Sequence, residues 1–485
     1  MNALKTDFAG IESPNPFWLA SAPPTNTGYQ VMNAYQAGWG GAVWKTLGRP
    51  IVNVSSRYGA TNYREQRIMG FNNIELITDR PLEVNLREME EVKRKFPKNA
   101  LIASLMVETR EEWHEIVKKC EGVGVDGFEL NFGCPHGMCE RGMGSAVGQN
   151  PDVAERITSW VKEVAAKPVI VKLTPNVASI IPPGLAAQRG GADAVSLINT
   201  INSVTGINLK TMDPNPSVGG FSTHGGYCGP AVKPIALNMV SELANHPDFH
   251  LPISGIGGIE TWEDAVEFFL MGASTIQVCT AVMHYGFRII EDIREGFANY
   301  LKEQKMERPT DLTGITARKL LKWEQLDLNY KVIANIDPGK CISCQLCYIA
   351  CDDGAHQAIR VRGNDSLAGS LLPPDNPLAR TGEARSSLAP SISRVRGNDS
   401  LASSLLPPDN PLARTGEARS SLAVPANRIP EIIKEACVGC NLCSLVCPVD
   451  DCITMVPVET GKPPITWTEH PQNPHRRSTI TQAKV

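Results

Sequence analysis

The sequence predicts an eight-stranded α/β barrel followed by a smaller cysteine-rich domain. Two observations support the barrel. Short apolar runs alternate with longer helical patterns over residues 1 to about 305, and polar or glycine residues recur where those runs end. Eight strand–helix units over about 300 residues are typical of a (β/α)8, or TIM, barrel. The alternative is a doubly wound sheet, which should carry a nucleotide fingerprint after its first strand.

Length and composition restrict the class of protein. A chain of 485 residues predicts two or three domains, and an apolar fraction of 42% supports a large core. A formal charge of -4 gives no sign of a nucleic-acid or membrane-surface partner. The segment from Met1 to Gly10 has no apolar signal-peptide core, and no apolar run approaches the ~18 residues of a membrane span. We therefore expect a soluble, cytoplasmic protein.

The barrel strands are predicted from short, β-rich apolar runs, each followed by a helical pattern. Helices are expected at Arg110–Glu121, Asp152–Ala166 and Glu263–Met271, among others. The eight predicted strands are Trp18–Ser21, Ala42–Lys45, Leu101–Leu105, Gly127–Asn131, Val169–Leu173, Ala194–Ile198, Leu251–Ser254 and Thr275–Val278.

Functional groups of such a barrel lie just after the C-terminal ends of its strands. Seven of the eight predicted strands end in polar or glycine residues. The run Ser254–Gly258 and the end of the eighth strand match the usual barrel phosphate site. Lys45 and Lys172 suit an anionic cofactor such as a reduced flavin, although a lysine at a strand end can also extend its ammonium into water. The strand-end residues include Ser21, Lys45, Thr46, Asn131, Cys134, Lys172, Asn199, Thr200, Gly257, Gly258, Cys279 and Thr280.

The loop of residues 131–144 follows the fourth predicted strand and is rich in glycine. It brings an amide, a thiol and an imidazole together within six residues, Asn131 to His136. A surface loop with an incidental buried cysteine is the alternative interpretation. The segment Gly122–Gly127 fits G-x-G-x-x-G, but it follows a helix and precedes a strand, the reverse of the dinucleotide-binding order. We interpret it as a helix-to-strand turn.

Eight cysteines form two runs of the pattern C-x2-C-x2-C-x3-C, and a proline follows the second run. This is the pattern of bacterial two-cluster ferredoxins, in which the fourth cysteine of each run binds the other [4Fe–4S] cluster. A zinc site is the alternative. Cys452 is an additional cysteine. The predicted ligands are Cys341, Cys344, Cys347 and Cys447 for the first cluster, and Cys437, Cys440, Cys443 and Cys351 for the second.

Between the two runs, residues 360–389 are repeated at 394–423 with one mismatch, Gly369 against Ser403. The repeat is polar and has no apolar period, which favours a duplicated, disordered insertion over a solenoid. The expected domains are a barrel at 1–305, a connector at 306–335, a ferredoxin-like α+β domain at 336–460 interrupted by the insertion at 360–425, and a tail at 461–485.

Several motifs resemble those of dihydropyrimidine dehydrogenases, in particular the FMN and iron–sulfur subunit of the bacterial NAD-dependent enzymes. They are the loop 131–144, the segments 73–77 and 172–176, the pair Asn199-Thr200, and the twin cysteine runs. The likeness covers nearly the whole chain except the insertion and the tail. One position departs from the family: Gly133 stands where a serine is usual.

The resemblance implies reversible reduction of the C5–C6 bond of uracil or thymine, with Cys134 as general acid. It also implies a partner subunit that carries FAD and NAD(H). A dihydroorotate dehydrogenase-like enzyme and an electron carrier with an inactive barrel are the alternatives. Implied pyrimidine contacts are Asn73, Asn131, Asn199 and Thr200; implied FMN contacts are Ser21, Lys45, Thr46, Asn131, Lys172, Gly229, Gly257, Gly258, Cys279 and Thr280.

Overall fold

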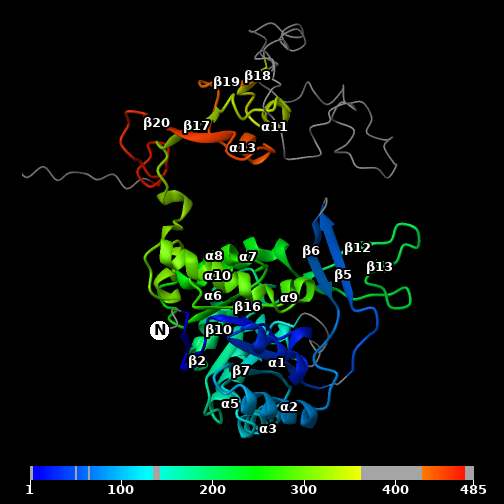
Figure 1. Cartoon of the computed structure of the whole chain (residues 1–485). Coiled ribbons are helices and arrows are strands. Elements are labelled where there is room, and N and C mark those ends of the chain that lie inside the picture. Colours follow the sequence, from blue (N-terminus) through cyan, green and yellow to red (C-terminus); the bar gives the residue numbers. More distant parts are fainter. Residues whose placement is uncertain (1–3, 50–51, 64–65, 135–141, 362–428, 476–485) are drawn as a thin grey trace, which may run out of the picture. The chain divides into compact units, whose positions relative to one another are not determined.

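The computed structural model describes residues 4–49, 52–63, 66–134, 142–361 and 429–475 (Figure 1). The chain divides into two compact units, Met1–Leu320 and Leu321–Val485. No helix in the described ranges is long and apolar enough to cross a membrane. Part of the loop of residues 131–144 (the active loop), including His136, and most of the duplicated insertion lie outside the described residues.

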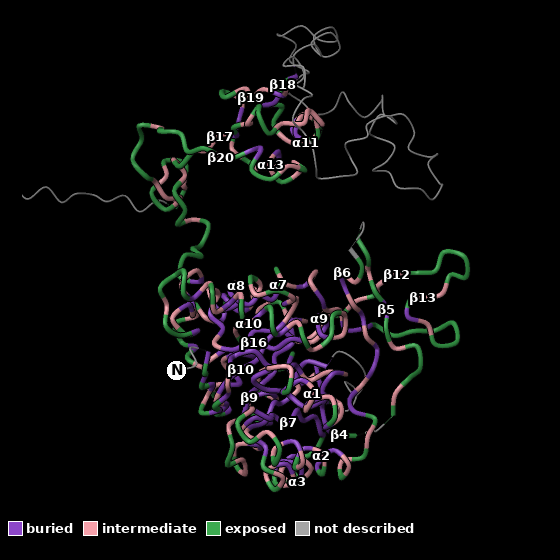
Figure 2. Tube along the Cα trace, viewed as in Figure 1, coloured by how far each residue is buried: buried purple, intermediate pink, exposed green. Residues whose placement is uncertain are grey.

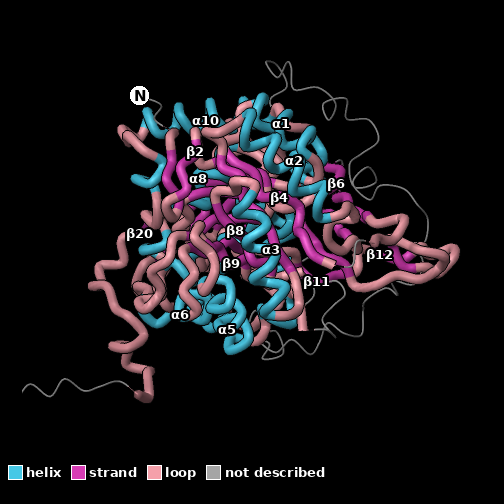
Figure 3. The backbone as a smooth tube through the Cα atoms, turned by 90° about the horizontal axis from the view of Figure 1, so that it is seen from below, coloured by secondary structure: helices cyan, strands magenta, loops and turns pink. Residues whose placement is uncertain are grey.

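The first unit contains a closed barrel of eight parallel strands. All eight predicted strands are confirmed, and the doubly wound alternative is wrong because the sheet closes on itself. Figure 3 shows these strands enclosed by helices. The barrel strands are β3 (Phe17–Leu19), β4 (Gly41–Gly48), β7 (Ala100–Met106), β8 (Gly127–Asn131), β9 (Val169–Lys172), β10 (Ala194–Leu197), β15 (Ile253–Ile256) and β16 (Thr275–Val278).

The helices bury apolar faces against the barrel, and α1, α3, α5 and α8 also begin with a side-chain N-cap. In α3, Thr109 and Glu112 form a capping box, and Trp113, Val117 and Cys120 lie on one buried face. The segment Gly122–Gly127 links α3 to β8, so its interpretation as a turn is confirmed. The helices are α1 (Gly28–Ala37), α2 (Leu82–Lys95), α3 (Arg110–Gly122), α4 (Ser145–Gly148), α5 (Pro151–Lys162), α6 (Ile181–Arg189), α7 (Lys233–Ala244), α8 (Trp262–Leu270), α9 (Thr280–Tyr285) and α10 (Ile289–Glu303).

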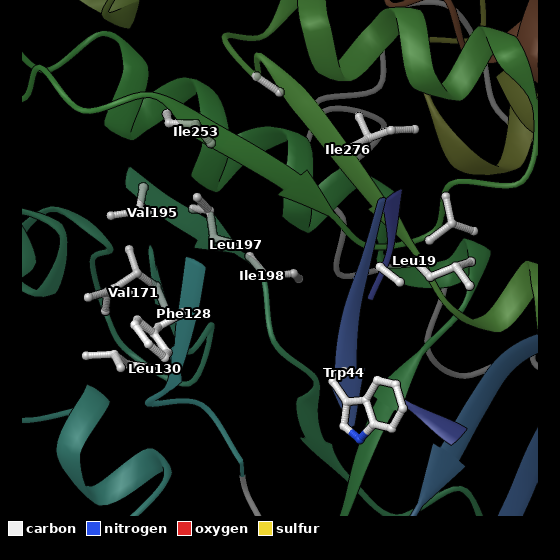
Figure 4. Close-up of a cluster of buried hydrophobic side chains, with 14 of the residues drawn as sticks. Leu19, Trp44, Phe128, Leu130, Val171, Val195, Leu197, Ile198, Ile253 and Ile276 are labelled. Carbon is white, nitrogen blue, oxygen red and sulfur yellow. The ribbon is translucent and has the colours of Figure 1, made fainter. Parts of the chain in front are cut away.

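The main core lies between the barrel strands and the helices. Figure 4 labels side chains of this core, among them Trp44, Phe128 and Ile276. Figure 2 shows that buried residues of this unit are concentrated in the barrel. Parallel strands covered on both faces read as nearly continuous apolar runs, which is why the sequence predicts them well. Residues 306–320 join this core: Leu312 is buried, and Gly314 N donates to Phe269 O at 2.9 Å.

The interior of the barrel changes from apolar to charged along its axis. Toward the N-terminal ends of the strands, the interior is an apolar cluster that includes Trp18. Phe8 and Ile11 close this end; they come from the hairpin of β1 (Thr6–Phe8) and β2 (Ile11–Ser13). Residues two apart on a strand share a face. Stepping two residues toward the C-terminal ends therefore replaces apolar side chains by buried polar ones: Val43 by Lys45, Ile102 by Ser104, Ile170 by Lys172, and Ala194 by Ser196.

A four-stranded antiparallel sheet adds residues to the open end of the barrel. The segments that form it follow β4 and β10 in the chain, and Figure 1 shows two of its strands, β5 and β6, side by side. Close packing requires glycine at Gly225, where a Cβ would lie 2.0 Å from Asn72 Oδ1. This sheet was not predicted. Its strands are β5 (Tyr58–Tyr63), β6 (Gln66–Asn73), β11 (Ile201–Ser203) and β14 (Gly225–Cys228); a separate pair is β12 (Gly206–Ile207) and β13 (Pro214–Asn215).

The second unit has two similar halves around the cysteine runs. β17 (Lys331–Ile336) pairs with β20 (Ile453–Val458), and β18 (Ile359–Val361) pairs with β19 (Pro430–Ile432), both antiparallel. Each cysteine run enters a short helix. These helices are α11 (Leu346–Gly354) and α13 (Leu442–Leu445). Across the described residues of both units, the 3-10 turns are η1 (Pro23–Thr25), η3 (Pro230–Val232), η4 (Pro309–Leu312), η5 (Ala317–Lys319) and η6 (Trp323–Gln325).

The insertion interrupts a β-hairpin, since β18 and β19 pair directly on either side of it. We predict that excising residues 362–423 leaves both cysteine sites able to assemble. Closure entropy changes by only ~0.6 kcal/mol per doubling of loop length, and the hairpin pairing remains. The iron and sulfide content of the excised protein should match that of the parent. A protein that loses iron on excision would show that the segment belongs to the folded scaffold.

Candidate active site

One cavity opens at the C-terminal ends of the barrel strands. Its empty volume is about 1070 Å³, part of it open to solvent. This is the face on which a (β/α)8 barrel carries its function. All fourteen predicted substrate, cofactor and acid residues line this cavity: Ser21, Lys45, Thr46, Asn73, Asn131, Cys134, Lys172, Asn199, Thr200, Gly229, Gly257, Gly258, Cys279 and Thr280.

A chain of amide and hydroxyl groups crosses the cavity wall. Asn199 Nδ2 donates to Asn131 Oδ1 at 2.9 Å, and Asn131 Nδ2 donates to Thr46 Oγ1 at 3.0 Å. Thr46 Oγ1 lies 3.1 Å from Ser21 Oγ. Asn199 Oδ1 also accepts from the Thr200 N–H at 2.8 Å. These bonds fix the orientation of both amides, so the wall presents donors and acceptors in set positions.

Lys45 forms a buried ion pair with Glu75, a residue to which the sequence gave no role. Tyr58 donates its hydroxyl proton to the other oxygen of the same carboxylate. Burial lowers the pKa of the Lys45 ammonium to about 8, with Arg57 acting in the same direction and Asp79 opposing. The Lys45 ammonium therefore remains mostly protonated at neutral pH. Glu75 follows β6, so its approach to Lys45 depends on the antiparallel sheet that the sequence did not predict.

Lys172 faces a second buried carboxylate, that of Glu129 on β8. The ammonium and Glu129 Oε1 are 3.5 Å apart. Ser196 Oγ and Gln277 Nε2 donate to the other carboxylate oxygen at 2.8 and 3.0 Å. A glutamate within an apolar strand was the only signal in the sequence, and its partners come from other strands.

Glycines shape the end of the cavity near β15. Gly229, Gly257 and Gly258 have φ values of +93°, +126° and +75°, which residues with side chains rarely adopt. Within the described part of the chain, no protein oxygen accepts from the N–H groups of Gly257 and Gly258. Free backbone N–H groups at this position suit a phosphate. The donor set, with two lysines and several hydroxyls, therefore fits a flavin mononucleotide.

Cys134 lies at the base of the active loop, buried in a small apolar cluster with Ile77, Met106 and Met143. Two other thiols line the cavity. Burial raises the pKa of Cys279 to about 12 and that of Cys228 to about 11, so both are protonated at neutral pH. Thr280 Oγ1 donates to Cys228 Sγ at 3.2 Å. Cys228 was not predicted, because it lies within the unpredicted sheet.

The cysteine runs form a second site. A cavity of about 350 Å³, partly open to solvent, is lined by Cys351, Cys437, Cys440 and Cys443, the four predicted ligands of the second cluster. Burial, then the nearby thiols of Cys437, Cys440 and Cys351, raise the pKa of Cys443.

The predicted first-cluster thiols are also close to one another. Burial, then the neighbouring thiols of Cys344 and Cys341, raise the pKa of Cys347 to about 12. Cys452 lies beside Cys447 and Cys341, and burial followed by these two thiols raises its pKa to about 12. Backbone N–H groups donate to ligand sulfurs, as Ala358 N does to Cys351 Sγ at 3.2 Å. Such donors stabilise the negative charge of cluster thiolates, so the donor set fits iron–sulfur clusters.

Comparisons with known proteins agree with this arrangement. A family model described as dihydroorotate dehydrogenase matches residues 3–301, and one described as a 4Fe-4S dicluster domain matches residues 416–455. The chain belongs to the dihydroorotate dehydrogenase family and is an oxidoreductase with a C-terminal 4Fe-4S dicluster domain.

Individual relatives confirm the resemblance to dihydropyrimidine dehydrogenases. The NAD-dependent dihydropyrimidine dehydrogenase subunit PreA of Escherichia coli K12 is 43% identical over 73% of this chain and 87% of its own length. The chloroplastic dihydropyrimidine dehydrogenase (NADP(+)) of Arabidopsis thaliana is 40% identical over 64% and 76%. The dihydroorotate dehydrogenase B (NAD(+)) catalytic subunit of Pyrococcus abyssi is 39% identical over 65% and 99%.

Gly133 allows the close approach of Asn199 that the amide chain requires. A Cβ at Gly133 would lie 2.4 Å from Asn199 Cβ and 2.5 Å from its Nδ2. We predict that Gly133→Ala displaces Asn199, breaks its bond to Asn131, and lowers the free energy of unfolding by about 1–3 kcal/mol, as overpacking does. Denaturant unfolding and a crystal structure of the variant measure both effects.

Gly122→Ala is the matched control, because a Cβ there has no atom within 4 Å. It should leave the amide chain unchanged and should not lower stability, because alanine is the better helix former. An unmoved Asn199 in a fully stable Gly133→Ala variant would contradict the packing argument.

Proposed function

We propose that this protein catalyses the reversible reduction of the C5–C6 double bond of uracil or thymine. The observation that carries the proposal is the convergence of three asparagines, Asn73, Asn131 and Asn199, with Cys134 on one cavity. The pyrimidine ring presents amide-like donors and acceptors along its edges. Asparagine amides match both kinds of group, and Thr200 adds a further polar contact.

FMN is the proposed resident cofactor, and when bound it supplies hydride chemistry at C6 of the pyrimidine. Gly229, Gly257 and Gly258 would receive its phosphate. Lys45 and Lys172 provide positive charge that favours an anionic reduced flavin. Ser21, Thr46, Asn131, Cys279 and Thr280 complete the proposed set of contacts.

Cys134 is the proposed general acid. Its thiol delivers a proton to C5 of the pyrimidine, a step that needs a positioned side-chain acid. Its apolar surroundings of Ile77, Met106 and Met143 restrict water around the thiol. In the reverse direction the thiolate accepts the same proton.

The charge balance of the cavity favours a neutral pyrimidine over orotate. Orotate carries a carboxylate, whose binding is favoured by a cation that is not already paired. Among the described residues that line the cavity, the cations are Lys45 and Lys172, and each faces a buried carboxylate. This supports uracil or thymine as substrate over dihydroorotate, the substrate named for the Pyrococcus relative.

The clusters point to a redox partner. Two [4Fe–4S] clusters would transfer electrons singly between the FMN and an FAD- and NAD(H)-binding subunit. The Escherichia coli relative is itself named a subunit of an NAD-dependent enzyme, which supports a hetero-oligomer. We also infer a cytoplasmic location, since the eight run cysteines fit cluster ligation rather than disulfides.

Cys134→Ala tests the assignment of the acid. The variant should retain FMN, because the thiol is not among the cofactor contacts, and should lose pyrimidine turnover by ~10²–10⁴-fold. Turnover is measured with the chemically reduced protein and uracil. Cys120→Ala, a buried thiol on α3 outside the cavity, is the control and should stay active. Near-parental turnover of Cys134→Ala would remove the residue from the mechanism.

A further inference from the structure

Glu129 occupies an unusual place in the barrel. It is fully buried on β8, two residues before Asn131, and so lies on the interior face of the same strand. It does not line the cavity, whereas Lys172 does. The carboxylate therefore lies behind the ammonium as seen from the cavity and contacts neither the proposed flavin nor the pyrimidine.

The hydrogen bonds of this carboxylate are unequally distributed. Oε2 accepts from Ser196 on β10 at 2.8 Å and from Gln277 on β16 at 3.0 Å. Oε1 has no hydrogen-bond partner among the described residues, and it faces Lys172 Nζ at 3.5 Å. The two hydrogen bonds to Oε2 thus hold Oε1 opposite the Lys172 ammonium.

Burying this ion pair lowers the stability that the same positions could provide. Burying two charges carries a desolvation penalty that well-packed apolar side chains would avoid, so a buried ion pair is weak evidence for stability. The neighbouring apolar layer of the same barrel, with Ile170 two residues before Lys172, is built without charges. The charges are therefore confined to the layer beside the cavity.

We propose that Glu129 is a positioning residue that orients the Lys172 ammonium toward the flavin and offsets its charge, and so sets the reduction potential of the bound FMN. The inference rests on the proposed function, since it requires FMN in the cavity. An uncompensated Lys172 would stabilise the anionic reduced flavin more strongly. The carboxylate opposes this and keeps the potential low enough for reversible exchange with a pyrimidine.

The test is the reduction potential of FMN in Glu129→Gln, measured in the full chain by anaerobic titration against a reference dye. Glutamine keeps the shape and can still accept from Ser196, but it removes the charge. At a fixed potential the ratio of reduced to oxidised FMN should rise about tenfold, an upward shift of about 30 mV for a two-electron couple. Glu129→Asp keeps the charge, but its side chain is one methylene shorter, so the carboxylate lies farther from the Lys172 ammonium. It should raise the potential by less than Glu129→Gln does.

Thr275→Val is the matched control. Thr275 is fully buried on β16, and its hydroxyl has no hydrogen-bond partner among the described residues, so the change removes a polar group without altering charge. Its flavin potential should equal that of the parent. If Glu129→Gln does not fold, Glu129→Asp carries the test against this control.

The outcomes separate the two proposals. A parent chain that binds no FMN contradicts the proposed function. Bound FMN whose potential is unchanged in the glutamate variants overturns the role of Glu129 alone. A shift in Thr275→Val as large as that in Glu129→Gln also overturns it, because the shift would then report disturbed packing and not charge.

Discussion

The site depends on two buried ion pairs at the open end of the barrel, Lys45 with Glu75 and Lys172 with Glu129. In each pair the lysine brings a positive charge to the cavity, and the buried carboxylate compensates that charge. Isolated charges could not be buried here, because desolvation would neutralise them. The closed sheet makes the pairs possible by bringing neutral donors from other strands into the barrel interior, such as Ser196 on β10 and Gln277 on β16 for Glu129. The balance of charge in turn supports a neutral substrate.

The apolar lower layer of the barrel complements this charged layer. Phe8 and Ile11 close the interior from below, and Trp18 fills it. The rigid, tightly packed base fixes the strands whose ends carry Asn131, Lys172 and the active loop. The antiparallel sheet then adds Asn73 and Glu75 from segments distant in sequence. The proposed substrate contacts thus come from both the barrel and the added sheet.

Much of the barrel could be predicted because local signals encode it. Parallel strands covered on both faces are apolar runs, and the polar residues after them must meet at one end, which located Lys45, Asn131 and Lys172. The four-stranded sheet could not be predicted, since its pairing is non-local and its strands are short and polar. Glu75 and Glu129 were missed for a related reason. A single glutamate gives no sign of its partner when that partner lies on another strand.

The cysteine spacing is a local signal of a different kind. It predicted the ligand sets because the fourth cysteine of each run is known to cross between clusters, and the structure gathers Cys351 with Cys437, Cys440 and Cys443. The packing of residues 306–320 on the barrel could not be seen in their charged sequence, because it rests on a few buried residues such as Leu312.

The most direct measurement of the central claim is flavin absorbance during anaerobic mixing of the purified, FMN-loaded chain with dihydrouracil or dihydroorotate. We expect dihydrouracil to bleach the flavin and dihydroorotate to leave it oxidised, because both cavity lysines are already paired. NADH without the partner subunit should also leave it oxidised. Bleaching by dihydroorotate alone, or by neither compound, would contradict the proposed function.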